Sequence, residues 1–174
     1  MRKHILAATI LACVLAVSFL CAGQAASPAA QSGKDSLLLT APPHDPWRLS
    51  VADLKGLPHM SVTIHNPHTN ADETYSGVRL ADLLAKMNAP LGSDLRGAAL
   101  ADYVAATGSD GYKAVLALGE VDPSFHSGEV IVADTMNGKP LDEHSGPFKL
   151  VVTEDKRPAR AVRNLVSIEL KSAQ

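Results

Sequence analysis

The sequence predicts one folded domain of the α+β class, with mostly antiparallel sheet and few helices. Several short stretches alternate apolar and polar residues, and turn signals such as Asn137-Gly138 separate them. One stretch, between Gly77 and Pro90, carries apolar residues at helical spacing over several turns. Many short strands with one clear helix are typical of a domain that packs helices on antiparallel sheet.

The expected elements begin at Trp47, with a strand over residues 47–51 and a single helical turn over residues 52–58. Residues 60–65 alternate apolar and polar side chains strictly, which predicts a half-buried strand. A polar loop over residues 66–73 then leads to the helix, which the sequence Asn88-Ala89-Pro90 ends. Further strands are expected over residues 98–106, 112–118, 129–133, 148–152 and 165–170.

The first 26 residues have the pattern of a secretory signal peptide. Two basic residues, Arg2 and Lys3, precede an apolar run over residues 5–21, and small residues follow over 22–26. We expect cleavage after Ala25 or Ala26 and a periplasmic or secreted product. A retained membrane anchor is the alternative, because the run approaches the roughly 20 residues that cross a bilayer. Residues 27–46, rich in Ala, Ser, Gly and Pro, are expected to form a flexible tether before the domain over residues 47–174.

Both cysteines, Cys13 and Cys21, lie inside this signal segment. The mature chain would therefore form no disulfide, carry no thiol nucleophile and offer no thiolate to a metal. Cleavage also removes two basic residues, which moves the formal net charge from −2 to −4. This acidic balance, together with an aromatic content of 4%, gives no reason to expect nucleic acid as a partner.

Histidines are the first candidates for a functional site, because no phosphate-binding glycine loop, zinc-protease helix or nucleophile elbow is present. His65 and His68 flank Asn66-Pro67, where a predicted strand enters a loop. Two imidazoles at this spacing could share a metal, but a third ligand would have to come from elsewhere. Exposed polar loop residues are the simpler interpretation.

Two other loops carry candidate binding groups. Ser109-Asp110-Gly111-Tyr112 is a turn that could place a hydroxyl, a carboxylate and backbone N–H groups at the rim of a sheet. A basic cluster over residues 156–163 includes Arg160 and Arg163, whose guanidinium groups suit a phosphate or carboxylate. A plain turn and a solvated charged loop remain the alternatives.

Five segments, in this order and spacing, resemble the molybdopterin-binding domain of sulfite-oxidase-type oxidoreductases. They are YSGVRLADLL (residues 75–84), DGYKA (110–114), MNGKPL (136–141), GPFKLVV (146–152) and VRNLVSIEL (162–170). The resemblance covers about Trp47 to Leu170. It implies the sulfite-oxidase-like fold, with a cleft for a pterin or molybdopterin that carries a phosphate.

In catalytic members of that family, a cysteine at the end of an early strand binds molybdenum. The corresponding place here is Thr63 to His68, which contains no cysteine, so we expect no molybdenum–thiolate ligation. The resemblance implies that His65 and Asn66 close the pocket and that Asp110 and Tyr112 meet the pterin, with Ser109 in the same turn.

The leading prediction is an exported, non-catalytic module that binds a small-molecule pterin, with Arg160 or Arg163 at its phosphate. The resemblance also implies a membrane signalling partner or a redox partner. A molybdopterin-dependent oxidoreductase is the main alternative, with His65 as an unconventional ligand or a partner subunit that completes the site. A scaffold protein without ligand and a histidine-based metal carrier also stay open.

Overall fold

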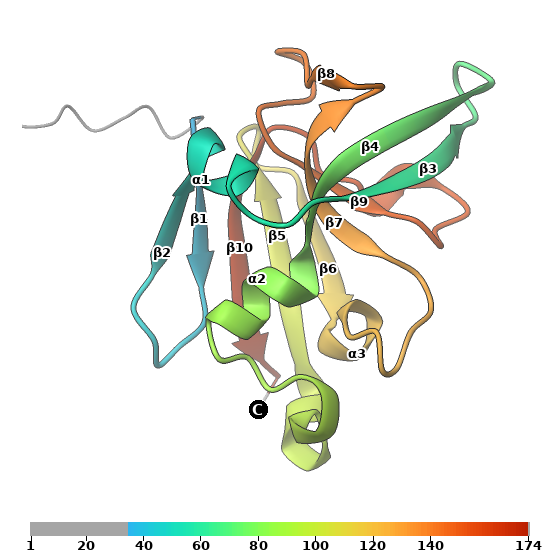
Figure 1. The fold of residues 1–174 in the computed structure, drawn as a ribbon. Helices are drawn as coiled ribbons and strands as arrows, with labels where there is room; N and C mark the ends of the chain where they lie inside the picture. Colours follow the sequence, from blue (N-terminus) through green and yellow to red (C-terminus); the bar gives the residue numbers. More distant parts are fainter. Residues whose placement is uncertain (1–34, 174) are drawn as a thin grey trace, which may run out of the picture.

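The computed structural model describes residues 35–173, and the predicted signal peptide lies outside them. Two five-stranded sheets form the domain (Figure 1). The strands are β1 (Ser36–Thr40), β2 (Trp47–Ser50), β3 (Met60–Asn66), β4 (Ala71–Arg79), β5 (Asp102–Gly108), β6 (Lys113–Ala117), β7 (Val130–Met136), β8 (Lys139–Pro140), β9 (Lys149–Val152) and β10 (Leu165–Ser172). The helices are α1 (Val51–Lys55), α2 (Leu80–Lys86) and α3 (Leu118–Val121), with 3-10 turns η1 (Gly92–Asp94), η2 (Gly97–Ala101) and η3 (Pro158–Arg160).

The first sheet has the strand order β2-β1-β10-β5-β6, and the second has the order β3-β4-β7-β8 with β9 also paired to β7. Only β1 and β10 run parallel, whereas every other described pair is antiparallel. With three short α-helices, this arrangement confirms the predicted α+β class.

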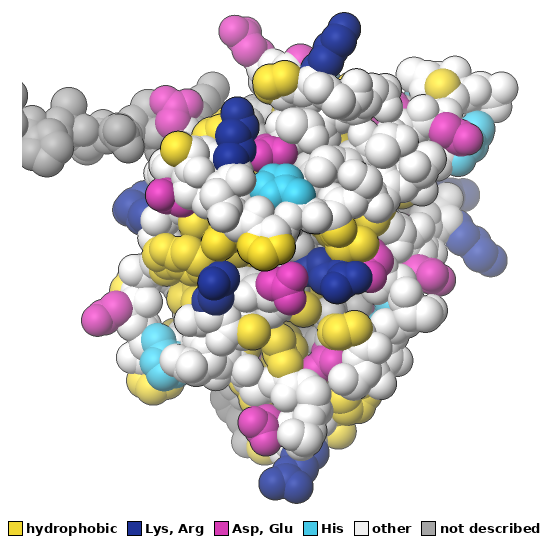
Figure 2. Space-filling view, viewed as in Figure 1, with side chains coloured by type: hydrophobic (Ala, Val, Ile, Leu, Met, Phe, Trp, Pro, Cys, Tyr) yellow, Lys and Arg dark blue, Asp and Glu magenta, His cyan; other side chains and the backbone are white. Residues whose placement is uncertain are grey.

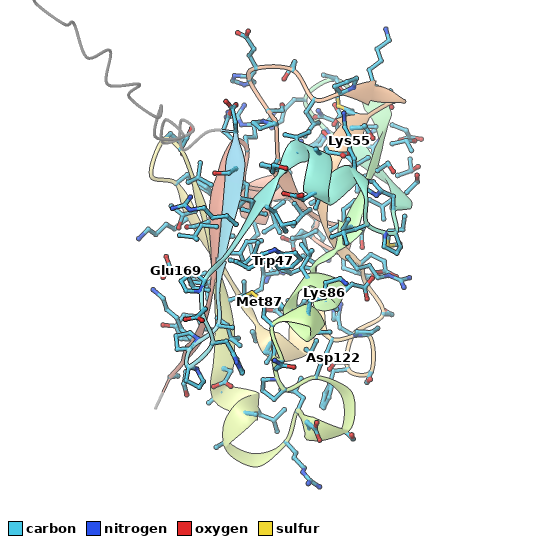
Figure 3. All side chains as sticks on the ribbon, turned by 60° about the vertical axis from the view of Figure 1, so that its left-hand side comes forward. Trp47, Lys55, Lys86, Met87, Asp122 and Glu169 are labelled. Carbon is cyan, nitrogen blue, oxygen red and sulfur yellow. The ribbon has the colours of Figure 1, made fainter. Side chains whose placement is uncertain are left out.

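The main hydrophobic core lies between the two sheets and is closed by α2, which crosses in front of the first sheet (Figure 1). Leu80, Leu83 and Leu84 of α2 are almost completely buried, because their spacing places them on one face of the helix. Trp47 packs at the edge of this core near Met87, as Figure 3 shows. A smaller cluster around Tyr75 lies on the other face of the second sheet.

The prediction of a flexible tether over residues 27–46 is wrong for its second half. Residues 36–40 form β1, which pairs with both β2 and β10, and Leu37 and Leu39 are fully buried. The three consecutive leucines of Ser-Leu-Leu-Leu-Thr explain this, because side chains alternate between the two faces of a strand and Leu37 and Leu39 share the face that enters the core. Residues 27–34 lie outside the described part of the chain.

Three predicted boundaries also differ from the structure. The expected polar loop over 66–73 ends early, because Ala71 already begins β4, and residues 77–79 continue that strand rather than start the helix. Polar side chains are tolerated in β4 because it forms a hairpin with β3 whose outer face meets solvent. Residues 97–101 form a 3-10 turn before β5 rather than part of the strand.

A β-bulge in β7 turns Asp134 into the protein interior. The register of β4 against β7 shifts between Ser76 and Gly77, so that Asp134 is the extra residue. Gly77 is required there, since a Cβ atom would lie 2.1 Å from the carbonyl oxygen of Val132. Asp134 Oδ2 lies 3.3 Å from His59 Nε2, and within residues 35–173 no partner reaches Oδ1.

The surface of the described domain carries both signs of charge. On the face shown in Figure 2, lysine and arginine side chains alternate with aspartate and glutamate, and apolar side chains form small separate groups. Across residues 35–173, every helix is too short or too polar to span a lipid bilayer.

Candidate functional site

A cavity of about 420 Å³ lies where three segments far apart in the sequence meet. They are the tip of the β3–β4 hairpin, the turn between β5 and β6, and the chain that runs from β9 to β10. The hairpin extends away from the body of the domain (Figure 1), so its tip can form one side of the opening. The volume of the cavity falls within the range of about 300–1,000 Å³ that is typical of small-molecule sites.

The structure brings five of the seven predicted site residues to this cavity. They are His65, Asn66, Asp110, Tyr112 and Arg163. Ser109 and Arg160 do not line it. Sequence analysis therefore located the region, although it did not distinguish the cavity residues from their immediate neighbours.

Hydrogen bonds within the hairpin fix the side chains at its tip. Asn66 accepts a bond of 2.9 Å from the backbone N–H of His68 and donates one of 2.6 Å to Glu73 Oε1. His65 Nδ1 lies 2.9 Å from Asp72 Oδ1. The amide of Asn66 is thus oriented by the protein, and the His65 bond leaves the Nε2 atom of that ring for other partners.

The turn between β5 and β6 places a carboxylate and a phenol side by side. Asp110 Oδ1 accepts a bond of 2.9 Å from the backbone N–H of Tyr112, and Gly111 adopts a φ of +84°, which favours glycine. The Tyr112 ring is 48% exposed, and its hydroxyl donates a bond of 2.5 Å to the carbonyl of Ala159. A flat, half-exposed ring next to a carboxylate suits a planar heterocycle with N–H donors at its edge.

Sequence analysis missed two residues that line the cavity, Glu73 and Lys149, and the buried Tyr75 that joins them. Lys149 Nζ donates a bond of 2.5 Å to the hydroxyl of Tyr75 and lies 4.2 Å from the centre of its ring. That hydroxyl donates a bond of 2.6 Å to Glu73 Oε2. The sequence did carry a signal for Lys149, because it is the one charged residue in the apolar stretch Phe-Lys-Leu-Val-Val. A charged side chain in such a stretch is seldom buried without a partner or a function.

The environment of this network shifts the ionisation of its members. Burial lowers the pKa of Lys149, and the positive charge of Arg163 acts in the same direction, while Glu73 and Asp142 oppose them. Burial alone would raise the pKa of Glu73, but hydrogen bonds from Tyr75 and Asn66 and the charge of Lys149 hold it below its ordinary value. Burial, followed by the Glu73 bond, raises the pKa of Tyr75. Glu73 thus compensates the ammonium of Lys149 in part, through space and through the Tyr75 hydroxyl, but burial and Arg163 still leave the pKa of Lys149 lowered.

The two candidate arginines have different roles. Arg160 donates to both carboxylate oxygens of Asp155 and to Glu120 Oε1, so its charge is neutralised by protein groups. Arg163 contacts His144 Nε2, and within residues 35–173 neither Arg163 nor Lys149 forms an ion pair with a carboxylate. Two cations that lack carboxylate partners thus face one cavity.

Ser109 lies next to the cavity and connects two neighbouring segments of the backbone. Its backbone N–H donates a bond of 2.9 Å to the carbonyl of Asn164, which joins the β5–β6 turn to the start of β10. No His, Cys, Asp and Glu side chains in the described chain gather in a group of three that could hold a metal ion.

The model of one protein family, described as the oxidoreductase molybdopterin binding domain, matches residues 27–174. The chain belongs to this family. The match confirms the resemblance found in the sequence, and it makes a pterin-type cofactor the first ligand to test against the cavity. A search of proteins with curated descriptions finds no match.

Among solved structures, the domain is similar to the crystal structure of the sulfane dehydrogenase SoxCD from Paracoccus pantotrophus, with a TM-score of 0.61. The two chains are 19% identical, and the likeness covers 82% of this chain and 40% of the other. The present chain thus corresponds to less than half of that relative. At this identity the likeness establishes the sulfite-oxidase-like fold and no more.

The residues of this molybdopterin-binding domain fit the organic part of such a cofactor. Lys149 and Arg163 suit a phosphate or carboxylate, and Asp110 with Tyr112 suits the polar edge and the flat face of a pterin. Among the described residues that line the cavity there is no cysteine, so this lining offers molybdenum no thiolate. The donors at the hairpin tip, an imidazole and an amide, are harder ligands than a thiolate.

Proposed function

We propose that this domain is a pterin- or molybdopterin-binding module without molybdenum oxo-transfer activity. The observation that carries the proposal is the pair of cations, Lys149 and Arg163, that face the cavity and form no ion pair with a carboxylate of residues 35–173. Two like charges in a partly buried site repel each other, and an anionic ligand would relieve that repulsion. Family membership supports a pterin that carries such an anion.

Each side of the cavity has a part in holding this ligand. The pterin ring would lie against Tyr112, and its amino and ring N–H groups would donate to Asp110. Its anionic arm would meet Lys149 and Arg163. Asn66, held by Glu73 and His68, would supply a fixed amide at the remaining side. Bound in this way, a pterin supplies a redox-active heterocycle, while the protein residues bind and orient it.

The missing thiolate supports a binding rather than a catalytic role. The alternative enzyme would use His65, whose Nδ1 is bonded to Asp72 so that Nε2 can act as a donor toward the cavity. A single imidazole is a weak anchor for molybdenum, and this alternative therefore ranks second. The amount of molybdenum in the purified protein distinguishes the two functions.

Export and partners complete the proposal. The basic, apolar and small segments of residues 1–26 support secretion or delivery to the periplasm, which the N-terminal sequence of the processed protein would test. A partner that senses whether the pterin is bound, such as a membrane signalling protein or a redox protein, would give a non-catalytic binder a use.

Fluorescence titration with pterin-6-carboxylate tests the proposed function. We expect saturable binding to one site, and weaker binding of unsubstituted pterin, which lacks the anion. Asp110→Ala should weaken both ligands by about tenfold, because a charged hydrogen bond contributes about 1.5–3 kcal/mol. Tyr112→Ala should weaken both through loss of the ring. Equal, unsaturable binding of both ligands to the wild type and both variants would contradict the proposal.

A further inference from the structure

One wall of the cavity has few apolar contacts to hold it in place. Val152 at the end of β9 and Val162 before β10 are buried, whereas most side chains between them are exposed. We call residues 154–161 the strap. Pro158, Ala159 and Ala161 of the strap line the cavity, so the position of the strap decides whether the cavity is closed on that side.

Arg160 provides most of the polar contacts that hold the strap. Its Nε and Nη2 atoms donate bonds of 2.9 and 2.5 Å to Asp155 within the strap, and its Nη1 donates a bond of 2.8 Å to Glu120 of α3. Glu120 is itself fixed, because its other oxygen accepts a bond of 2.8 Å from the backbone N–H of Ala117. The guanidinium therefore joins the two ends of the strap to each other and to the body of the domain.

Tyr112 supplies the second attachment. Its hydroxyl donates to the carbonyl of Ala159, and the same residue lines the cavity. A ligand that packs on the Tyr112 ring would therefore touch the group that holds the middle of the strap. The other two basic side chains of the strap, Lys156 and Arg157, contribute no attachment of this kind. Both are exposed and form no ion pair within the described chain.

We propose that residues 154–161 act as a movable strap over the cavity and that Arg160 is the positioning residue that keeps it closed. Ligand would enter and leave when the ion pair between Arg160 and Glu120 of α3 breaks, because this pair joins the strap to the body of the domain. The identity of that ligand rests on the proposed function, whereas the motion of the strap does not. The side chains of Arg160 and Glu120 are 33% and 38% exposed, so salt can screen their attraction.

The test compares Arg160→Gln with Arg157→Gln, which changes the neighbouring strap arginine that forms no ion pair. Hydrogen exchange of residues 154–161 reports the strap directly in the ligand-free protein. The rate at which a small amine-reactive reagent modifies Lys149 reports access to the cavity. The modification rate of the exposed Lys156 serves as the internal reference. We expect Arg160→Gln to raise both rates about five- to tenfold, and Arg157→Gln to leave both unchanged.

Binding kinetics complete the experiment. For pterin-6-carboxylate, Arg160→Gln should raise the association and dissociation rate constants together, while Kd changes little. Increasing the salt concentration from about 50 mM to about 500 mM should move wild type toward this variant. Glu120→Gln, which removes the same ion pair from α3, should give the same result if Arg160→Gln folds poorly.

Failure of this inference differs from failure of the proposed function. Equal exchange and equal Lys149 labelling in wild type, Arg160→Gln and Glu120→Gln would overturn the strap, even if the pterin binds normally. If the two rates rise as expected but no pterin binds, the strap stands and the proposed ligand is wrong.

Discussion

The cavity and the corner around Asp122 both contain buried charge, but they satisfy it differently. Asp122 is 1% exposed, and its carboxylate accepts bonds from the backbone N–H groups of Gly92 and Ser124. These two bonds join the loop after α2 to the end of α3, where Figure 3 labels Asp122. In the cavity, the ammonium of Lys149 donates to the Tyr75 hydroxyl, its one hydrogen-bond acceptor among residues 35–173, and feels both the negative charge of Glu73 and the positive charge of Arg163.

This difference separates a structural charge from a binding charge. A charge whose partners all come from the protein stabilises the fold and has nothing left to offer a ligand. A charge that keeps free donors and has no directly paired carboxylate can still gain stabilisation from an anionic ligand. The following predictions test whether the two regions behave in these two ways.

The largest effect is expected for Asp122→Ala. The substitution removes two charge-assisted hydrogen bonds and leaves the N–H groups of Gly92 and Ser124 without their partner. We expect the free energy of unfolding to fall by about 3 kcal/mol, with pterin binding unchanged in the protein that remains folded. Urea unfolding measures this, and Asp45→Ala, at an exposed loop position, is the control. A decrease in the free energy of unfolding of less than about 1 kcal/mol would contradict a structural role for Asp122.

Lys149→Ala should give the opposite result. We expect the affinity for pterin-6-carboxylate to fall about tenfold or more, because the ligand loses a charged donor. The free energy of unfolding should change by less than about 1 kcal/mol, since removal of the ammonium also removes its repulsion by Arg163. Lys86→Ala, on the exposed face of α2, serves as the control. A large loss of stability with unchanged affinity would assign Lys149 to the fold instead.

The same contrast should appear on acidification. Burial alone would raise the pKa of Asp122, but the bonds from Gly92 and Ser124 hold it below the ordinary 3.8. The unfolded chain then takes up a proton at a higher pH than the folded chain does, so the stability that Asp122 contributes is complete above 3.8 and is lost as the pH falls through the lower folded value. The difference in unfolding free energy between wild type and Asp122→Asn should shrink below that pH. A constant difference down to about pH 2.5 would argue against it.

Alkaline pH should affect the cavity rather than the Asp122 corner. Because burial lowers the pKa of Lys149 below the ordinary 10.5, its ammonium loses a proton at a lower pH than a free lysine does. Affinity for pterin-6-carboxylate should therefore decline as pH rises toward that value, and Lys149→Arg should decline less because a guanidinium stays protonated. Isothermal titration at several pH values measures the two slopes. Parallel slopes would exclude Lys149 as the titrating group.

The smallest effect is expected for Tyr112→Phe. This change keeps the ring and removes only the hydroxyl bond to Ala159, which lies at a half-exposed position. Pterin affinity should change about twofold or less, whereas Tyr112→Ala should lose substantially more. Equal losses in the two variants would show that the hydroxyl, and not the ring, binds the ligand.

Elements with strong local patterns could be predicted from the sequence. Strand β3 alternates strictly, and α2 repeats Leu at helical spacing, so both were expected near their observed positions. Strand β1 was missed because Pro and Ser around it resemble a tether, and its burial depends on β10, which lies more than 100 residues further along the chain. Strand β4 was missed because one side of it faces water.

The candidate site was predictable only in part, for a similar reason. Arg160 and Arg163 come from one basic cluster and are equivalent in the sequence. They differ because Glu120, 40 residues away, reaches Arg160. Glu73 and Lys149 meet only through Tyr75 and the hairpin, which no local pattern encodes. The segments that resemble the family located the cavity in the sequence. Which of its neighbouring charged side chains are already paired with protein groups depends on tertiary contacts.

The most direct test of the account is the composition of the protein as purified from cells. Mass spectrometry of the bound small molecule and metal analysis should find a pterin near one equivalent with molybdenum far below it. Molybdenum at one equivalent, retained through purification and cycling between redox states, would contradict the central claim that this cavity binds a pterin without a metal–thiolate centre.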